Sequence, residues 1–381
     1  MLGIEHWLGY PYGTDGQEEK LTPRGSAPDR GPPLNSTDGD SSKEDHHFPH
    51  KVAIMSSATS LANFLSNSSL ANGLRKLVGA GNRQPRAYRL INVQLKQRIS
   101  LSPCMARFVF AGEDVAHTRT LAPDQRIKLL FPAADGLPPE LPCSGDWHAA
   151  RRKLPAAQQP PMRTYTIRAL RAEPAELDVD FVLHGVTGPA SRWATHAKVG
   201  DRLQMAVPDK AFSGDPGGYE WQPPAGIRKV LLIGDETALP AIAGILEDLM
   251  EYPTPPDVQA FIEVPHESDC LALRHNHQTR LSWLPRDVLG ASHGEALMHA
   301  ARELAELPAP GKHPRPLKPQ EHADDLRPWD SAKPADNHFY AWIAGESGTV
   351  MKIRRHLINE RGLERRNLAL MGYWRLGRSL E

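Results

Sequence analysis

Short apolar segments occupy the chain between residues 88 and 207, and polar turns separate them. Apolar residues that alternate with polar ones over four to eight positions predict β-strands. Six strands are predicted, at residues 90–95, 105–110, 126–131, 163–170, 177–183 and 202–207. Their spacing favours a closed, antiparallel, six-stranded barrel over a sheet covered by helices. The proline-rich stretch from residue 133 to 162 is expected to be a surface loop.

A different pattern begins at Arg228. Residues 229–234 are a continuous apolar run, typical of a parallel strand that is buried on both faces, and an apolar helix is predicted at 241–250. Strands at 259–264, 280–284, 339–344 and 368–371 and helices at 295–307 and 350–361 continue the alternation. Alternating strands and helices predict a doubly wound parallel sheet.

These patterns divide the chain into three parts. Residues 1–85 are rich in Gly, Pro, Ser and acidic residues, and they are predicted to be a disordered or partly helical leader because they bury too little apolar surface. Residues 86–226 are the predicted β-barrel domain, and residues 227–381 are the predicted α/β domain. Residues 308–337 are expected to be an insertion at the surface of the α/β domain.

Charge and hydropathy narrow the classes of function. Lysine plus arginine total 45, and aspartate plus glutamate also total 45, so net charge gives no argument for nucleic acid or an anionic membrane. No apolar run has the length of a membrane span, and the N-terminus lacks the pattern of a signal peptide. We therefore expect a cytoplasmic monomer with no nucleic-acid partner and no integral membrane association.

The cysteines give no sign of a metal site. Cys104, Cys143 and Cys270 are far apart and form no C-x-x-C pair. Three scattered thiols do not supply a disulfide framework, a zinc site or the four ligands of an ordinary iron–sulfur cluster. We expect no metal ligands in this chain.

One strand carries polar chemistry that suits a flavin dinucleotide. Arg163 offers a guanidinium for a pyrophosphate, Tyr165 a ring that can lie against an isoalloxazine, and Thr166 a hydroxyl donor. Taken alone, this pattern is also that of an ordinary strand with an exposed arginine. His184 ends a later strand, where it can donate to a flavin or to a backbone carbonyl.

A turn further along predicts an anion site. Residues 188–193, Gly-Pro-Ala-Ser-Arg-Trp, predict a tight turn into a helix N-terminus, where free backbone N–H groups bind phosphate. The alternative is a helix that Ser191 merely caps. The position of this turn after the Arg163 motif favours the anion site.

Two loops predict a nucleotide crevice. Residues 234–240 and 344–349 each follow a predicted parallel strand, and ligands of such sheets lie beyond the carboxyl ends of the strands. The chain has no G-x-G-x-x-G there, so these loops alone indicate only that a nucleotide can bind.

In this order, the motifs resemble the siderophore-interacting protein family, flavin-dependent ferric-siderophore reductases related to ferredoxin-NADP reductases. The resemblance runs from about residue 86 to the C-terminus and rests on residues 163–166, 184–194, 234–241, 342–346 and 372–377. Arg126 is a departure, because the family usually has histidine just before the V-K-L of this strand. The leader and the 308–337 insertion also exceed the usual length.

The resemblance implies FAD and NAD(P)H as cofactors and a ferric siderophore as the substrate. The residues that it implies for FAD are Arg163, Tyr165, Thr166, His184, Gly188, Ala190, Ser191 and Trp193. Those implied for the nicotinamide cofactor are Thr237, Ala238, Gly345 and Glu346, with Asp235 and Tyr373 as catalytic residues near the flavin edge. Lys128 is implied to bind the anionic siderophore.

Other arginines are candidates for the same basic rim. Arg126 either adds charge beside Lys128 or points inward. Arg375 and Arg378 are candidates for the opposite wall, and Arg378 is equally well explained as a solvated residue near the C-terminus.

The implied reaction passes a hydride from NAD(P)H to FAD and then single electrons to siderophore-bound Fe(III), which releases Fe(II). NADPH is favoured over NADH because Arg274 and His275 can meet a 2′-phosphate, although Glu263 can instead hold a ribose hydroxyl. The alternatives are a general flavin reductase or diaphorase, and a siderophore-binding protein without turnover.

Overall fold

The structure is a computed structural model, and it describes residues 86–186, 188–309 and 329–377. The chain separates into units 1–75 and 76–381, and all described residues belong to the second unit. The predicted leader, most of the predicted insertion and Arg378 lie outside the described residues. Within the described ranges, no helix is both long enough and apolar enough to cross a membrane.

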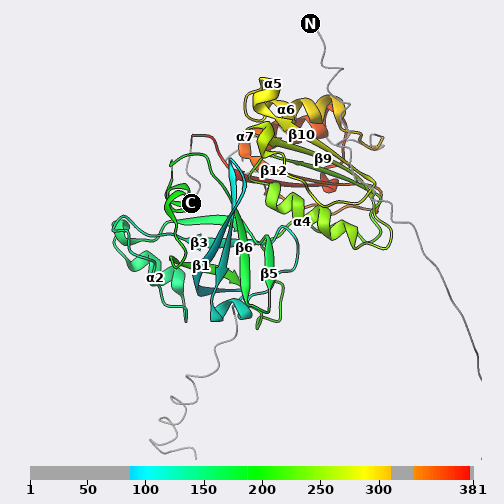
Figure 1. The fold of residues 1–381 in the computed structure, drawn as a ribbon. Coiled ribbons are helices and arrows are strands. Elements are labelled where there is room, and N and C mark those ends of the chain that lie inside the picture. Colours follow the sequence, from blue (N-terminus) through cyan, green and yellow to red (C-terminus); the bar gives the residue numbers. More distant parts are fainter. Residues whose placement is uncertain (1–85, 187, 310–328, 378–381) are drawn as a thin grey trace, which may run out of the picture. The chain divides into compact units, whose positions relative to one another are not determined.

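Seven antiparallel strands form the first sheet (Figure 1). In chain order they are β1 (Tyr88–Ser102), β2 (Met105–Ala111), β3 (Arg126–Leu130), β4 (Met162–Thr166), β5 (Ala169–Arg171), β6 (Glu176–Val182) and β7 (Arg202–Pro208). Their order in the sheet is β4-β3-β7-β1-β2-β6-β5. The ladder runs from β4 to β5 without closing, so the prediction of a closed six-stranded barrel is wrong in both count and closure.

The extra strand arises where one strand was predicted over residues 163–170. The Ile167 N–H still donates to the Gln125 carbonyl, next to the start of β3, whereas the Arg168 N–H donates to the Asp178 carbonyl of β6. Residues 169–171 then pair with β6 as β5. The segment predicted as one strand therefore forms the two edge strands, β4 and β5, of a curled sheet. Phe108, Phe110, Phe131 and Phe181 pack together on the buried face of this sheet.

Short helices accompany this sheet. They are η1 (Glu113–His117), α2 (Trp147–Lys153), η2 (Ala156–Gln158) and α3 (Pro189–His196). Helix α2 lies within the stretch predicted as a surface loop. It buries Trp147 against Leu90, Leu130 and Leu141, so part of this stretch covers the outer face of the sheet.

The second sheet has six strands, in the order β10-β9-β8-β12-β13-β11. Their bounds are β8 (Lys229–Gly234), β9 (Asp257–Val264), β10 (Thr279–Pro285), β11 (Trp329–Asp330), β12 (Tyr340–Glu346) and β13 (Leu368–Trp374). Five strands are parallel, whereas β11 pairs antiparallel with β13. The sheet is thus mixed rather than wholly parallel, and β11 comes from the predicted insertion.

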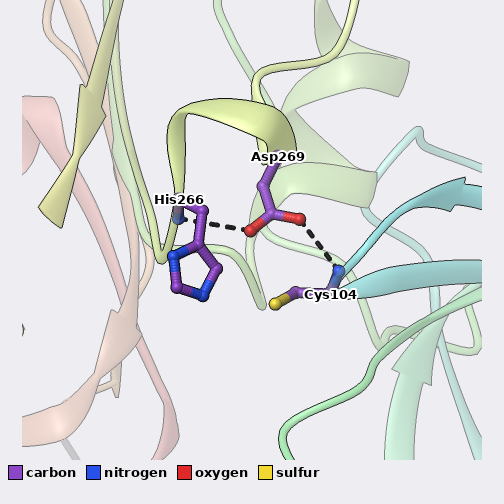
Figure 2. Close-up of side chains that lie close together, drawn as sticks. All are labelled: Cys104, His266 and Asp269. Atoms are coloured by element: carbon purple, nitrogen blue, oxygen red, sulfur yellow. Dashed lines mark hydrogen bonds between the residues drawn. The ribbon is translucent and has the colours of Figure 1, made fainter. Parts of the chain in front are cut away.

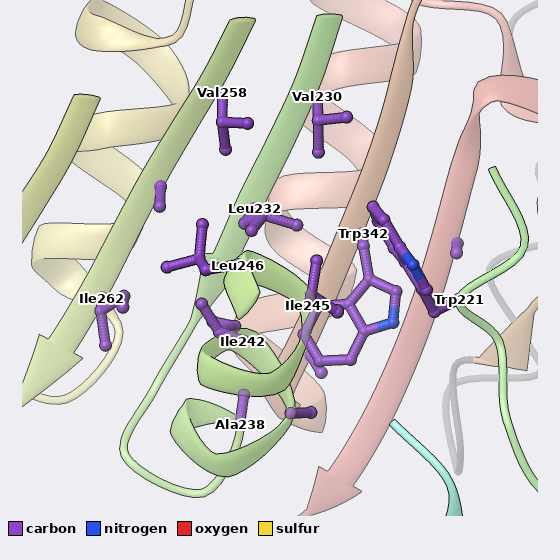
Figure 3. Close-up of a cluster of buried hydrophobic side chains, with 14 of the residues drawn as sticks. Trp221, Val230, Leu232, Ala238, Ile242, Ile245, Leu246, Val258, Ile262 and Trp342 are labelled. Atoms are coloured by element: carbon purple, nitrogen blue, oxygen red, sulfur yellow. The ribbon is translucent and has the colours of Figure 1, made fainter. Parts of the chain in front are cut away.

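Alternate residues of β8 pack on opposite faces of this sheet. Val230 and Leu232 meet α4 (Leu239–Met250), as Figure 3 shows. Leu231 and Ile233 pack in the other core, with apolar residues of α6 (Glu295–His299) and α7 (Ser347–Arg355). This double burial explains why the strand reads as an unbroken apolar run.

Irregular helices complete the second half of the chain. The predicted helices at 295–307 and 350–361 are present, but each ends in a π-helical segment, η4 (Ala300–Leu304) and η6 (His356–Glu360). The remaining short elements are η3 (Glu267–Asp269), α5 (Arg286–Leu289) and η7 (Arg365–Asn367).

Candidate functional site

The two segments predicted to bind FAD meet at the buried side chain of Phe181. The Tyr165 ring on β4 lies 4.3 Å from the Phe181 ring, between centroids, and the Trp193 ring on α3 lies 5.9 Å from it. Trp193 is also within 6 Å of Phe108, Phe110 and Phe131, so part of its ring belongs to the core. Aromatic packing thus brings residues 163–166 and 188–193 together, although they are separated in sequence.

The side chains of β4 divide between two faces. Tyr165 pairs with Ile127 of β3 and faces the apolar interior, where burial raises the pKa of its phenol. Thr164 pairs with Lys128 on the opposite face, and the Lys128 Nζ donates to the Thr164 Oγ1 at 3.1 Å. Thr166 shares that opposite face and is buried, so its hydroxyl and the Tyr165 ring leave the strand in opposite directions.

Helix α3 begins with an ordered turn. The Ser191 Oγ accepts a hydrogen bond from the Gly188 N–H at 3.0 Å, and Pro189 occupies the first helical position. This fixes the turn, but the N–H groups of Ala190 and Ser191 have no acceptor one turn earlier in the helix. They form the kind of N-terminus at which a phosphate binds. His184, which precedes this turn, is exposed.

Asp235, directly after β8, is the most heavily bonded carboxylate of the second sheet's carboxyl edge. Its Oδ1 accepts from the N–H and the Oγ1 of Thr237, at 3.0 and 2.5 Å. Its Oδ2 accepts from the Glu346 N–H at 2.8 Å and the Trp374 Nε1 at 2.9 Å. Burial, followed by the charge of Glu236, raises the pKa of Asp235, while the bond from Thr237 opposes that rise.

Gly345 is required where β12 passes Asp235. Its φ is +147°, and a Cβ at this position would lie 2.6 Å from the Asp235 Oδ2. Any other residue would therefore be strained and would displace the carboxylate. The next residue, Glu346, caps α7 by accepting from the Thr349 N–H at 2.7 Å. Burial raises the pKa of Glu346, but the backbone donors of residues 348, 349 and 376 outweigh burial and lower it.

Two other residues predicted for the nicotinamide cofactor differ in placement. Thr237 is half-buried beside Asp235. Ala238 is fully buried, and its methyl group lies in the core with Ile242 and Leu232 (Figure 3). Ala238 therefore has no side chain to offer a cofactor from this position.

Tyr373 lies between two indole rings near the end of β13. Its ring is 6.5 Å from that of Trp329, nearly parallel to it, and 6.3 Å from that of Trp342, edge-on. Its hydroxyl is buried without a hydrogen-bond partner among the described residues, and burial raises the pKa of the phenol. A buried hydroxyl without a partner is uncommon in a native protein, and a bound polar group would satisfy it.

Arg126 points inward. Its guanidinium lies 4.3 Å from the Trp329 ring centroid, and its Nη2 is 3.3 Å from the Glu220 Oε1. The Trp329 Nε1 donates to the same oxygen at 2.7 Å. Of the two placements weighed for Arg126, the inward one is observed, which corrects its assignment to the substrate rim. Lys128 is exposed and Arg375 is half-buried.

Sequence reasoning missed His293, which precedes α6. The His293 Nε2 lies 3.5 Å from the Asp235 Oδ2 and 3.9 Å from the Glu263 Oε1, and its ring meets that of Trp374 edge-on at 4.9 Å. A histidine within a loop has no periodic signal, so only the fold brings it to Asp235.

Glu263 is fully buried and accepts from the Arg286 Nη1 at 3.0 Å and the Gly294 N–H at 2.8 Å. These bonds oppose the predicted alternative in which Glu263 binds a ribose. Arg274 and His275 are both exposed.

The residues fit a flavin dinucleotide. The α3 N-terminus offers free N–H groups, Arg163 lies on β4, and the hydroxyl of Tyr373 has no hydrogen-bond partner within the part of the chain that the structure describes. The carboxyl ends of β8, β12 and β13 converge on Asp235, which fixes the loops beyond them. In sheets of this kind such an edge is the place where a nucleotide binds.

Comparisons with known proteins agree with this arrangement. Residues 94–212 match the family model of the siderophore-interacting FAD-binding domain, and residues 227–377 match that of the siderophore-interacting protein. A solved structure of a siderophore utilization protein from T. fusca is 30% identical, with a TM-score of 0.59, and the match covers 77% of this chain and 95% of that one.

The matches with three curated relatives cover most of the length of each relative. An uncharacterized protein of Mycobacterium tuberculosis (strain H37Rv) is 33% identical over 296 residues, which are 74% of this chain and 88% of the relative. The ferric vibriobactin reductase ViuB of Vibrio cholerae is 28% identical over 307 residues, 79% and 94%. The NADPH-dependent ferric-chelate reductase of Escherichia coli is 27% identical over 292 residues, 75% and 92%.

Proposed function

Because the chain belongs to the siderophore-interacting protein family and is an FAD-dependent oxidoreductase, we propose that it is an NAD(P)H-dependent ferric-siderophore reductase. The relatives whose names state a ferric substrate, from Vibrio cholerae and Escherichia coli, support this proposal. The observation that carries it is the carboxyl edge at Asp235, where three strand ends are fixed beside the half-buried Tyr373, whose hydroxyl has no hydrogen-bond partner among residues 86–186, 188–309 and 329–377. When bound, FAD supplies hydride acceptance and one-electron donation.

In this proposal, residues 86–226 form the FAD domain. Arg163 and the N–H groups of Ala190 and Ser191 bind the pyrophosphate, with Gly188 shaping the turn. Tyr165, the exposed edge of Trp193 and the exposed His184 line the cofactor, and Thr166 contributes through its backbone. The exposure of His184 and the half-buried position of Trp193 support these roles.

Residues 227–381 form the NAD(P)H domain in the same proposal. Asp235 positions Thr237, Gly345 and Glu346 so that their backbone borders the nicotinamide. Tyr373 closes the crevice and excludes water, since its ring is packed between two indoles. NADPH is proposed over NADH because Arg274 and His275 are exposed after β9, whereas Glu263 is engaged in the core.

The substrate is Fe(III) in an anionic siderophore, such as a tris-catecholate. Lys128 is exposed on the outer face of β3, where its charge attracts such an anion, and Arg375 is proposed to contribute from the other side. No protein ligand to iron is needed, because electron transfer requires proximity rather than coordination. Reduction weakens binding by hard oxygen ligands, and Fe(II) is released.

The test begins with the purified protein, which is expected to be yellow. Under anaerobic conditions, NADPH should bleach the flavin band, and a ferric tris-catecholate should restore it while a ferrous chelator captures Fe(II). Colourless protein that cannot be reconstituted with FAD would refute the proposal. A flavin band that NADPH bleaches but ferric siderophore does not restore would identify a general flavin reductase instead.

A further inference from the structure

A second group of ligand-type side chains lies apart from the residues assigned to the cofactors. Cys104 stands in the turn between β1 and β2, whereas His266 and Asp269 belong to the segment around η3, beyond the end of β9 (Figure 2). One ligand atom from each of the three residues lies within 4.8 Å of the other two. The fold thus brings together a thiol, an imidazole and a carboxylate from segments more than 160 residues apart in the chain.

Asp269 is buried and fixed. Its Oδ1 accepts from the Ser102 Oγ at 2.6 Å and the Cys104 N–H at 2.9 Å. Among the residues that the structure describes, the backbone bond that its Oδ2 accepts comes from the His266 N–H, at 3.2 Å. A carboxylate oxygen can accept two bonds, so Oδ2 retains a lone pair on the side of the cluster. The hydrogen bonds hold this oxygen in place without using its full capacity.

The imidazole of His266 is held in place by a carboxylate on the side of the ring away from Cys104 (Figure 2). Its Nδ1 lies 3.2 Å from the Asp287 Oδ2, and Figure 2 shows the Nε2 side of the ring turned towards the Cys104 sulfur. The Asp287 Oδ1 accepts from the N–H groups of Glu267 and Val288, at 3.1 and 2.8 Å, which anchors the carboxylate. A carboxylate on the far nitrogen of a histidine is the usual outer contact of a metal-binding histidine.

We propose that Cys104, His266 and Asp269 bind a divalent transition metal of the Zn²⁺ class, with a fourth position open to water. Three atoms within 4.8 Å of one another share a point no more than about 2.8 Å from each, and Zn²⁺ bonds to these ligands are about 2.0–2.3 Å. Shifts of less than about 1 Å therefore complete the site. A sulfur, nitrogen and oxygen donor set suits Zn²⁺ and excludes Mg²⁺ and Ca²⁺, which prefer oxygen ligands alone.

The metal would tie the β1–β2 turn to the α/β domain. Asp269 already makes this link by hydrogen bonds to Ser102 and Cys104. A cysteine binds a metal as its thiolate, so metal uptake releases the thiol proton. The proposed site departs from the expectation that the chain has no metal ligands, which rested on spacing in the sequence alone.

Zinc titration of the reduced full-length holoprotein, followed by calorimetry, tests the site without turnover. We expect one tight site in the wild type, and Cys104→Ser or His266→Gln to weaken it at least about 100-fold, since loss of an outer contact alone costs about 10–100-fold. Asp287→Asn, which alters only the outer contact of His266, should weaken zinc binding by about 10–100-fold. Cys270→Ser is the matched control, because Cys270 is also a half-buried free cysteine and directly follows Asp269 in the chain.

X-ray absorption at the zinc edge should then give one sulfur at about 2.3 Å, with nitrogen and oxygen at about 2.0–2.2 Å. The proposal is overturned if Cys104→Ser and His266→Gln bind Zn²⁺ as the wild type does, because the binding then belongs to adventitious sites among the 17 histidines. It is overturned equally if sulfur is absent from the bound metal, or if Cys270→Ser removes the sulfur. His266 is exposed, so its replacement should leave the fold intact. These results are independent of the proposed reductase activity.

Discussion

The indole Nε1 of Trp374 donates to the buried Oδ2 of Asp235 at 2.9 Å. Trp374 is the last residue of β13 and Asp235 follows β8, and these two strands flank β12, whose Glu346 N–H donates to the same oxygen. One carboxylate therefore sets the relative positions of three loops at the edge where we propose that the nicotinamide cofactor binds.

Replacement of Asp235 by Asn should disturb this edge. An amide keeps one acceptor oxygen, so its NH₂ group must face either the two donors from Thr237 or those from Glu346 and Trp374. We expect a loss of about 1–3 kcal/mol in unfolding free energy and slower reduction of the flavin by NADPH. Thermal unfolding and anaerobic stopped-flow measurements would record the two effects.

Asp257→Asn is the control, because Asp257 is exposed at the amino end of β9 in the same sheet. It should leave both quantities unchanged. Flavin reduction at the wild-type rate in Asp235→Asn would remove Asp235 from the proposed mechanism, whatever the change in stability.

Asp124 should make the stability depend on pH. Burial raises the pKa of its carboxyl, although the N–H groups of Glu220 and Trp221 and the Trp342 Nε1 all donate to its Oδ2 and oppose the rise. In the unfolded chain the pKa is about 3.9. Because the folded pKa is the higher one, the stabilising contribution of Asp124 is complete below about pH 4 and is lost as pH rises towards the folded pKa.

Asp124→Asn should remove this dependence. The amide oxygen can keep the three donors, and the NH₂ group takes the place of Oδ1, which has no partner among the described residues. We expect the stability of the wild type relative to the variant to fall by up to about 1.4 kcal/mol per pH unit above pH 4. Urea unfolding at several pH values measures the difference, and parallel curves for the two proteins would contradict the prediction.

Local patterns in the sequence predicted most strands and the family, but not the contacts between distant segments. The strands at residues 177–183 and 229–234 could be predicted because burial of one or both faces imposes a fixed pattern of apolar residues. The inward turn of Arg126 depends on Glu220 and Trp329, which lie 94 and more residues away. No pattern in the sequence around Arg126 predicts its contacts with Glu220 and Trp329.

The same limit applies to the cluster of Cys104, His266 and Asp269. The argument against a metal site used spacing along the chain, whereas the β1–β2 turn reaches η3 only through the packing of two sheets. Strand β11 was missed for a related reason, since a two-residue strand leaves no periodic pattern. The open edges of the first sheet also depend on where the chain changes partner, from β3 at Ile167 to β6 at Arg168, and no periodic pattern in the sequence marks that point.

Arg163→Gln should weaken FAD binding. In our proposal the guanidinium contacts the pyrophosphate, and a hydrogen bond to a charged group contributes about 1.5–3 kcal/mol, or roughly 10- to 150-fold in the dissociation constant. Arg192→Gln is the control, since Arg192 is exposed on α3 next to the predicted phosphate turn. Titration of FAD into the apoprotein, followed by fluorescence, gives both constants. A larger loss for Arg192 than for Arg163 would move the pyrophosphate away from β4.

Lys128→Glu should separate the two half-reactions. Lys128 is exposed on the opposite face of the sheet from Tyr165, so a reversed charge there should repel an anionic ferric siderophore without reaching the proposed flavin site. We expect siderophore reduction to slow roughly tenfold at low ionic strength, while flavin reduction by NADPH keeps its rate. The difference should shrink with added salt, because screening shortens the range of the charge.

Lys229→Glu makes the same charge change at the amino end of β8, away from the carboxyl edge, and should alter neither half-reaction. Stopped-flow traces of flavin reduction and reoxidation at two salt concentrations compare the three proteins. Equal slowing of both half-reactions in Lys128→Glu would mean that the variant disturbs the sheet rather than the substrate. A salt-independent loss confined to the siderophore step would instead mean that Lys128 contacts the bound siderophore directly, rather than attracting it from solution.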